Sequence, residues 1–457
     1  MHESTSKSSR YSLVLLTSLF FMWGFITVLN DILIPHLKAV FELTYLEAML
    51  VQFAFFGAYF IGGLLYFLIS MISGDPISKI GYKNGIIIGL LMSALGTILF
   101  YPAAHFQFYG FFLTALFVLG LGFAMLQIAA NPYVAILGPE SSASSRLNLS
   151  QGFNSFGTTI GPILGGFFIF EYFKNTDNGA DSVVVPYLVL TAMLLFLAIA
   201  IKGAKLPRFV NVTHAIKGAG ALKFRQLRLG AIAIFLYVGA EVAIGSFLIS
   251  YFGLEKIAGF TEAQASPFVS FYWGGAMIGR FLGAISLSAI DRKKKYISML
   301  FVSVLAFSVV YLAVYLKTGV SFEQIIPYIV FLLLNYFAFI IGKSLPGRTL
   351  SIFALAPIVL LLVGIFGSHL WAMWAILGIG IFNSIMWSNI FTMAIKGLGD
   401  FTSQGSSILV MFIVGGAILP PIQGAVADLV GVQLSFFVPM LSYVYLAYYG
   451  WKGHLAK

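Results

Sequence analysis

Apolar segments long enough to cross a lipid bilayer recur from one end of the chain to the other. A membrane-spanning helix needs about 17–25 mostly apolar residues, and short segments that carry Gly, Pro and most of the charges separate these runs. The pattern predicts about fourteen spans, at residues 11–35, 46–72, 84–103, 107–136, 149–170, 184–203, 229–254, 265–290, 296–316, 324–343, 349–366, 371–395, 404–428 and 434–451. We therefore expect an all-α polytopic membrane protein.

A basic linker separates the first six predicted spans from the remaining ones. Its basic residues, which lie among Gly and Ala, are Lys205, Arg208, Lys217, Lys223, Arg225 and Arg228. We therefore predict an N-terminal six-helix bundle at residues 1–203, a cytoplasmic linker at 204–228 and a C-terminal bundle at 229–457.

The positions of Lys and Arg indicate the orientation of the chain. Loops that stay in the cytoplasm are rich in these residues. If the N-terminus is inside, only Lys38, Lys174, Lys256 and Lys317 among the 26 Lys and Arg residues fall outside, while Arg280 lies within a span. An even number of spans returns the C-terminus to the starting side, so we expect both termini to be cytoplasmic.

Composition agrees with a membrane protein and removes other classes. Hydrophobic residues make up 60% of the chain and charged residues 9%, with a mean hydropathy of +0.97, and such a chain does not fold alone in water. The net charge of +10 follows from the basic inner loops, because no soluble basic stretch carries the interleaved aromatics of a nucleic-acid surface. The lack of cysteine excludes disulfides and thiolate chemistry.

Ionisable residues inside predicted spans are candidates for function. A charge at bilayer depth costs from about 2.5 to more than 10 kcal/mol, so it usually faces a wet cavity or a partner. We expect Asp31, near the end of the first span, to act in coupling, and Glu241, in the seventh, to line the cavity. Arg280, beside Gly279 and Gly283, is expected to be structural and to pair near the inner helix ends.

Polar side chains line single faces of several predicted helices. The sets with helical spacing are Trp23, Thr27 and Asp31 in the first span, Gln127 and Asn131 in the fourth, and Gln151 and Asn154 in the fifth. Residues spaced in this way share one face of a helix. Asn and Gln both donate and accept hydrogen bonds, as each hydroxyl of a sugar does, so the stripes favour a neutral polyol.

The candidate substrate-binding residues are these polar side chains together with two tryptophans whose rings could stack on a sugar. They are Trp23, Thr27, Asn30, Gln127, Asn131, Gln151, Asn154, Asn383 and Trp387. An alternative remains for each. An amide can simply join two helices, at about 0.6 kcal/mol, and a tryptophan can simply pack.

Four segments resemble one family of sugar carriers. They are LNDILIPHLK at 29–38, AANPYVAILGPESSASSRLNLSQGFNSFGTTIGP at 129–162, YVGAEVAIGSFL at 237–248 and FNSIMWSNIFTMAIKGLGDFTSQGSSILVM at 382–411. These strings are similar to the fucose/glucose/galactose:proton symporter family of the major facilitator superfamily. The resemblance covers nearly the whole chain except residues 291–348.

The resemblance implies the major facilitator fold, with two six-helix bundles that rock around a central site. The family's aspartate implicated in proton coupling falls on Asp31. Its glutamine and asparagine implicated in sugar contact fall on Gln151 and Asn154, and its first-helix tryptophan falls on Trp23. The resemblance also implies a bacterial inner-membrane protein.

Two departures from the family pattern bear on function. The fucose carrier has a second essential carboxylate where this chain has Gln127, and a neutral amide cannot carry a proton. Glu241, where the fucose carrier has an amide, could supply the missing acid, which points toward the glucose, galactose or N-acetylglucosamine branch. The second departure is Trp387 followed by Ser388 and Asn389, where family members show Tyr or Phe followed by Pro and Thr.

Residues 291–348 read as a two-helix insertion, with spans at 296–316 and 324–343. Two spans return the chain to the same side, so the later helices keep their orientation. Because the insertion has few polar residues beyond Asn335, we expect it to pack on the outside of the C-terminal bundle.

The expected function is import of a neutral, glucose/galactose-like hexose by cation symport with alternating access. The expected ion is the proton, carried by Asp31 and Glu241. A passive sugar facilitator, a sodium-coupled symporter and a carrier of fucose or N-acetylglucosamine remain alternatives. Enzyme activity is not expected, because the six His are scattered and HExxH and GxSxG are absent. We expect no cofactor or metal, sugar and lipids as partners, and neither nucleic acid nor an obligate protein partner.

Overall fold

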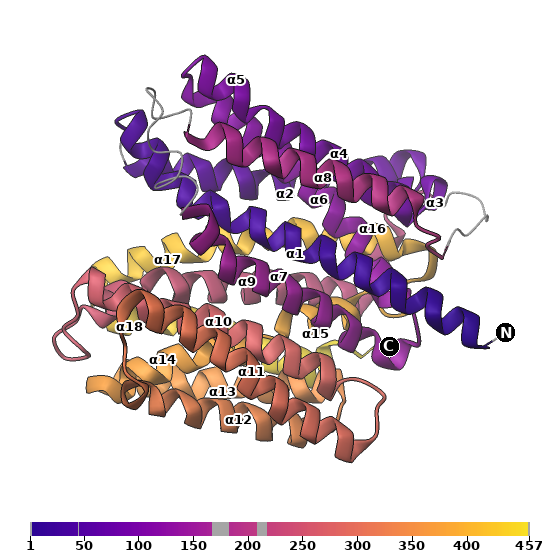
Figure 1. The fold of residues 1–457 in the computed structure, drawn as a ribbon. Helices are drawn as coiled ribbons and strands as arrows, with labels where there is room; N and C mark the ends of the chain where they lie inside the picture. Colours follow the sequence, from indigo (N-terminus) through magenta and orange to yellow (C-terminus); the bar gives the residue numbers. More distant parts are fainter. Residues whose placement is uncertain (1, 44, 167–181, 208–216, 456–457) are drawn as a thin grey trace. The chain divides into compact units, whose positions relative to one another are not determined.

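The computed structural model describes residues 2–43, 45–166, 182–207 and 217–455, which form α-helices joined by turns and short 3-10 segments (Figure 1). The α-helices are α1 (His2–Val40), α2 (Tyr45–Ser73), α3 (Pro76–Ile80), α4 (Tyr82–Ile98), α5 (Phe100–His105), α6 (Tyr109–Ile136), α7 (Ala143–Gly166), α8 (Val184–Gly203), α9 (Arg225–Phe252), α10 (Glu262–Ser286), α11 (Arg292–Thr318), α12 (Ile326–Gly342), α13 (Pro346–Phe366), α14 (His369–Asn383), α15 (Met386–Ala394), α16 (Thr402–Met411), α17 (Gly415–Val430), α18 (Val432–Ser435) and α19 (Phe437–Tyr448).

Twelve segments of the described residues are helical, long and apolar enough to cross a membrane. The two other predicted spans fall on α7 and α19. The described part of α7 stops at Gly166, and α19 is only 12 residues long. The predicted count of about fourteen spans is therefore not confirmed, whereas the all-helical, membrane-spanning architecture is.

The chain forms two compact units. Unit 1 is Met1–Gly138, Phe156–Lys223 and Gly397–Met411, and unit 2 is Pro139–Ser155, Phe224–Lys396 and Phe412–Lys457. Unit 1 therefore includes residues 397–411 from after the predicted linker, and unit 2 includes residues 139–155 from before it. Hydrogen bonds hold both segments, because Gln404 binds Ser70 within unit 1 and Asn148 binds Asn389 within unit 2.

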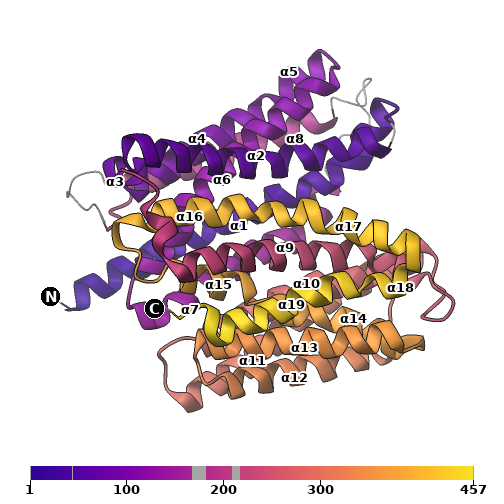
Figure 2. The same cartoon turned by 180° about the vertical axis from the view of Figure 1, so that it is seen from behind.

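Within unit 1, α4, α6 and α8 run side by side (Figures 1 and 2). The crossing of α4 and α6 is so close that a Cβ atom on Gly122 would collide with Ser93. Small residues allow this approach between membrane helices, where dispersion contacts replace the hydrophobic effect. The Thr97 and Thr191 hydroxyls, 2.8 Å apart, add a hydrogen bond between α4 and α8.

The end of the linker is held inside unit 1 by a buried amide on α16. Nε2 of Gln404 donates to the Ser70 hydroxyl at 3.1 Å and to the Gly218 carbonyl at 3.0 Å, and Oε1 accepts from the Ala221 amide at 2.9 Å. The Gly218 amide donates to the Met71 carbonyl at 2.8 Å. This part of the linker is therefore an ordered connection between α2 and α16.

Unit 2 is built around α14 and α15, because 89% of the residues in their segment are buried, whereas only 35% of those in the α11 segment are. Phe301 and Val304 on α11 are 67% and 59% exposed, so α11 lies at the edge of the unit. Its neighbour α12 contacts inner helices, because Tyr328 donates to the Phe271 carbonyl at 2.6 Å and Asn335 to the Ile381 carbonyl at 3.3 Å. Asn335 thus serves helix packing.

Asp75 starts α3 in the short connection between α2 and α4. Its Oδ1 accepts from the Ile77 amide at 3.0 Å and from the Tyr66 hydroxyl, and Pro76 occupies the first helical position, where proline is favoured. Burial raises the pKa of the Asp75 carboxyl above its ordinary value of 3.8, although hydrogen bonds from Tyr66 and Ile77 oppose the shift. The folded protein therefore holds a proton there more strongly than the unfolded chain does.

The first prediction concerns the pH dependence of stability. Because the folded-state pKa of Asp75 is raised, stability falls as pH rises from about 4 through the folded-state pKa. Asp75→Asn keeps the Oδ1 acceptor and removes the cost of burying an ionised carboxylate. The melting temperature of the variant in detergent, relative to that of the parent, should therefore increase as pH rises, by about 2–4 °C per kcal/mol of that cost. Asp428→Asn, at an exposed acid, is the control; a parallel pH profile for Asp75→Asn and the parent would contradict the prediction.

Candidate functional site

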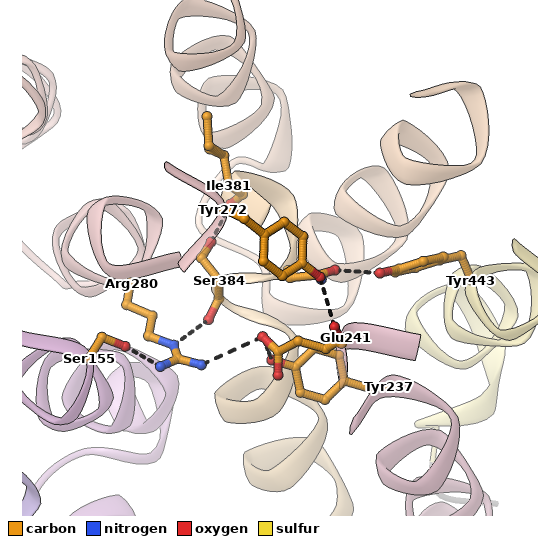
Figure 3. Close-up of polar contacts among 9 residues, drawn as sticks. Ser155, Tyr237, Glu241, Tyr272, Arg280, Ile381, Ser384 and Tyr443 are labelled. Atoms are coloured by element: carbon orange, nitrogen blue, oxygen red, sulfur yellow. Dashed lines mark hydrogen bonds and ion pairs between the residues drawn. The ribbon is translucent and has the colours of Figure 1, made fainter. Parts of the chain in front are cut away.

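A largely buried ion pair lies in unit 2 between α9 and α10 (Figure 3). Oε1 of Glu241 lies 4.0 Å from Nη2 of Arg280, and the side chains are 10% and 13% exposed. Tyr237, one turn earlier on α9, donates its hydroxyl to the same Oε1 at 2.9 Å. The carboxylate therefore has one charged and one neutral partner, in surroundings where an unpaired charge would be strongly destabilising.

The Arg280 guanidinium also binds the end of a broken helix. Since α14 ends at Asn383 and α15 begins at Met386, carbonyl groups near the break are open to side-chain donors. Nε of Arg280 donates to the Ser384 carbonyl at 3.1 Å, and Nη1 donates to the Ser155 hydroxyl on α7 (Figure 3). One forked cation, with five N–H donors, thus joins α7, α9, α10 and the break.

A chain of hydrogen bonds runs from α19 to the backbone of Glu241. Tyr443 on α19 donates to Oδ1 of Asn383 at 2.7 Å, and Nδ2 of Asn383 donates to the Tyr272 hydroxyl at 2.9 Å. Tyr272 on α10 in turn donates to the main-chain oxygen of Glu241 at 3.0 Å (Figure 3). Asn383, Tyr272 and Tyr443 are each at most 1% exposed. The position of Glu241 is therefore fixed through its main chain as well as its side chain.

A second polar cluster lies in unit 1, on α1, α2 and α6. Nε1 of Trp23 donates to the Tyr59 hydroxyl at 3.3 Å, and the side chain of Gln127 interacts with the same hydroxyl. Thr27 donates to the Trp23 carbonyl at 2.8 Å. Asn131, one turn after Gln127, is fully buried, and neither amide atom has a partner in the described part of the chain. Four predicted residues thus lie on two helices of this unit.

Two amides predicted on α7 lie in unit 2, on the same segment as Ser155. Gln151 is 6% exposed and Asn154 is half-buried. Trp387 on α15 is 7% exposed and stacks on Phe391, with ring centroids 5.9 Å apart. Its Nε1 has no partner among the described residues. Asn30 and Asp31 lie on α1, but their side chains fall outside the described part of the structure.

The polar contacts define the candidate site better than the shape of unit 2 does. A cavity of about 570 Å³ is lined at helix ends by residues such as Lys256, Phe366 and Gln433, and it shares no residue with the Glu241 cluster. Among the described residues, no group of three or more His, Asp or Glu could hold a metal ion.

Comparison with known proteins identifies the class. A family model described as the Major Facilitator Superfamily matches residues 13–347. The chain belongs to the Major Facilitator Superfamily. A glucose/galactose transporter of Brucella abortus biovar 1 (strain 9-941) is 43% identical over 460 residues, covering 99% of this chain and 97% of that protein. The L-fucose-proton symporter of Escherichia coli (strain K12) is 32% identical over 465 residues, covering 96% and 92%.

Solved structures agree with this assignment. The crystal structure of the E. coli fucose:proton symporter FucP matches with a TM-score of 0.75 and 30% sequence identity, covering 97% of this chain and 98% of that one. These relatives confirm the resemblance to the fucose/glucose/galactose:proton symporter family. The chain is therefore an integral membrane transporter of the major facilitator fold and not an enzyme.

Arg280 was expected from the sequence to form a structural pair near the inner helix ends, and the structure places it beside Glu241. The structure also adds residues that the sequence patterns did not single out. Tyr237 had a readable signal, since it stands four residues before Glu241 and so shares its helical face. Tyr272 and Tyr443 had none, because they are two of 22 tyrosines and their meeting depends on how three helices pack.

The second prediction tests the ion pair. Arg280→Met keeps a long apolar side chain but leaves Glu241 unpaired and Ser384 without its donor, which should cost on the order of 3–5 kcal/mol of stability. Adding Glu241→Gln should recover part of this loss, because the uncompensated charge is gone. Thermal unfolding in detergent measures both, with Lys293→Met at an exposed lysine as control. Equal melting temperatures for the Arg280→Met and Lys293→Met variants would show that the pair is not stabilising.

Proposed function

We propose that this transporter imports a neutral hexose of the glucose/galactose type by symport with protons, through alternating access. The observation that carries the substrate class is the 43% identity with a named glucose/galactose transporter along nearly the whole chain. The relative named as an L-fucose-proton symporter supports the proton as the coupling ion. Bacterial relatives favour the inner membrane, and the Lys and Arg distribution favours cytoplasmic termini.

The proposed sugar contacts are the polar side chains and tryptophans singled out in the sequence, apart from Asn383. The amide of Asn131 and Nε1 of Trp387 have no partner among the described residues, and each can serve a sugar hydroxyl, which both donates and accepts. The other proposed contacts are Trp23, Thr27, Asn30, Gln127, Gln151 and Asn154. Trp23 and Trp387 also offer ring faces for the apolar side of a hexose.

Glu241 and Asp31 are the proposed proton carriers. Ionised Glu241 pairs with Arg280, and protonation would release the guanidinium to other acceptors. The 4.0 Å separation exceeds the about 2.7–3.2 Å of an N–H···O hydrogen bond, so a sugar hydroxyl could accept from Arg280 and donate to Glu241. Because enclosing a charged carboxylate is costly, the carrier would reorient when these acids are neutral or paired.

A passive sugar facilitator is the second candidate. It is favoured by Gln127, a neutral amide at the position where the fucose carrier of the family has an essential carboxylate. If Glu241 does not take over that role, the chain would equilibrate sugar without coupling. Transport driven by an imposed pH gradient separates these two functions.

The third prediction tests the function in proteoliposomes. Purified protein should accumulate labelled galactose above the external concentration when the outside is made acidic, and a protonophore should abolish accumulation because it removes the driving gradient. Replacing sodium by choline should change nothing. Galactose exchange that ignores the pH gradient would favour the facilitator, and accumulation that requires sodium would favour a sodium symporter.

The fourth prediction assigns the coupling acids. Asp31→Asn and Glu241→Gln cannot bind and release a proton, so each should abolish gradient-driven accumulation while counterflow of galactose between equal pH values stays within about tenfold of the parent. Glu323→Gln, at an exposed acid on the insertion, should accumulate galactose normally. Full accumulation by either coupling variant would exclude that residue as a proton carrier.

A further inference from the structure

Both polar atoms of the Asn383 amide have protein partners. Its oxygen accepts from Tyr443 and its nitrogen donates to Tyr272, at 2.7 and 2.9 Å, and the residue is 0% exposed. This separates it from Asn131, which is equally buried but whose amide atoms have no partner in the described chain. The nitrogen and the oxygen of Asn383 each already have a tyrosine partner, whereas a sugar hydroxyl would give the amide of Asn131 its first partner among the described residues.

The direction of the Tyr443–Asn383–Tyr272 chain is fixed by its last member. A carbonyl oxygen only accepts, so the Tyr272 hydroxyl must donate its one proton to the Glu241 carbonyl, 3.0 Å away. That hydroxyl can then only accept from Asn383, which must turn its NH₂ toward Tyr272 and its oxygen toward Tyr443. The amide orientation therefore follows from chemistry, although oxygen and nitrogen of an amide look alike.

An asparagine is well suited to the centre of this chain. It offers a donor and an acceptor on one rigid plane, so it can receive a proton from one tyrosine and present one to the other. Leucine would provide neither, and an ionised aspartate would provide only acceptors. Asn383 is also the last residue of α14, next to the Ser384 carbonyl that binds Arg280. The same turn of chain thus contacts both partners of the ion pair, Glu241 through Tyr272 and Arg280 directly.

We propose that Asn383 is a positioning residue for proton coupling, which holds Glu241 opposite Arg280 through Tyr272, and that it does not bind the sugar. The proposal rests on the proposed function, because it takes Glu241 as a proton carrier. It predicts that Asn383 governs how transport depends on pH and leaves sugar affinity nearly unchanged.

The groups around Glu241 limit what else could set its pH dependence. Among the described residues, the titratable and charged groups that face it are Tyr237 on α9, Tyr272 and Arg280 on α10, and Tyr443 on α19. The helix α15 contains no titratable residue, and those of α14 and α17, His369 and Asp428, are exposed. Two of these four groups, Tyr272 and Tyr443, are hydrogen-bonded to Asn383. A third, Arg280, is the ion-pair partner of Glu241.

The experiment compares three variants for galactose counterflow in proteoliposomes as pH is varied equally on both sides. Asn383→Leu removes both hydrogen bonds of the amide. Asn383→Asp offers a donor and an acceptor, as asparagine does, while its carboxyl is protonated, and it offers only acceptors once the carboxyl is ionised. Asn335→Leu is the matched control, since Asn335 is another fully buried asparagine of unit 2 whose amide bonds the Ile381 carbonyl of α14 and, among the described residues, neither Tyr443, Asn383 nor Tyr272.

A positioning role predicts a split between rate and affinity. Asn383→Leu should lower the maximal rate at least about tenfold, because it removes two buried hydrogen bonds that hold Tyr272 in place, and should displace the midpoint of the pH profile. Its half-saturating galactose concentration should stay within about threefold of the parent. Asn383→Asp should match the parent at acid pH and fail as pH rises. Asn335→Leu should keep the parental midpoint.

Other results would overturn the proposal. A rise in half-saturating galactose concentration at every pH, with an unmoved midpoint, would make Asn383 a sugar ligand. A midpoint shift of equal size in Asn335→Leu would reduce the effect to general loosening of the unit.

A measurement without sugar separates failure of the inference from failure of the proposed function. Melting temperatures of Asn383→Leu, Tyr272→Phe and the double variant should be non-additive, because each single change cuts the same connection. If the parent exchanges no galactose, the proposed function fails, while strong non-additivity still establishes the coupling of Asn383 to Tyr272, the residue that bonds the Glu241 main chain. Additive melting shifts overturn the inference whatever the parent transports.

Discussion

A charge enclosed among membrane helices has to be met by an opposite charge, and much of unit 2 is arranged around this requirement. Removing an ion from water costs several kcal/mol even after relaxation, so Glu241 is tolerable only while Arg280 or a proton neutralises it. Arg280 meets this demand and also binds the Ser384 carbonyl and the Ser155 hydroxyl. The same guanidinium therefore stabilises a carboxylate, a helix break and the contact with α7, and loss of one partner affects the other two.

Hydrogen-bonding capacity sorts the buried polar residues into two kinds. Residues whose amide nitrogen and oxygen both have protein partners, such as Asn383 and Gln404, fix helices and connections in place. Residues with unused atoms, such as Asn131 and Trp387, leave a cost that a hydroxylated ligand can remove, because an unpaired buried polar group is destabilising. A carrier needs both kinds, since a fixed frame gives the coupling acid its position and open sites give the substrate its affinity.

The sequence predicted the helices far better than it predicted which residues meet. Hydropathy located the spans because a bilayer demands long apolar runs, and the long motifs led to the family. The encounter of Glu241 with Arg280 could not be read, because residues on different helices come together through packing that periodicity does not encode. The break after Asn383 also lacked a signal, since neither Gly nor Pro occupies positions 384 and 385. Tyr272 and Tyr443 were two unmarked aromatics among many.

The contacts of residues 139–155 within unit 2 suggest how the ion-pair region can respond to a conformational change. This segment is attached by hydroxyls and amides, with Ser144 bonded to Thr392 at 2.6 Å and Asn148 bonded to Asn389 at 3.2 Å. Such bonds can be exchanged for bonds to water at a small net cost, whereas separating an apolar contact exposes hydrocarbon. Because Ser155 of the same segment binds Arg280, any displacement of this part of α7 changes the partners of the guanidinium and so the balance between a charged and a protonated Glu241.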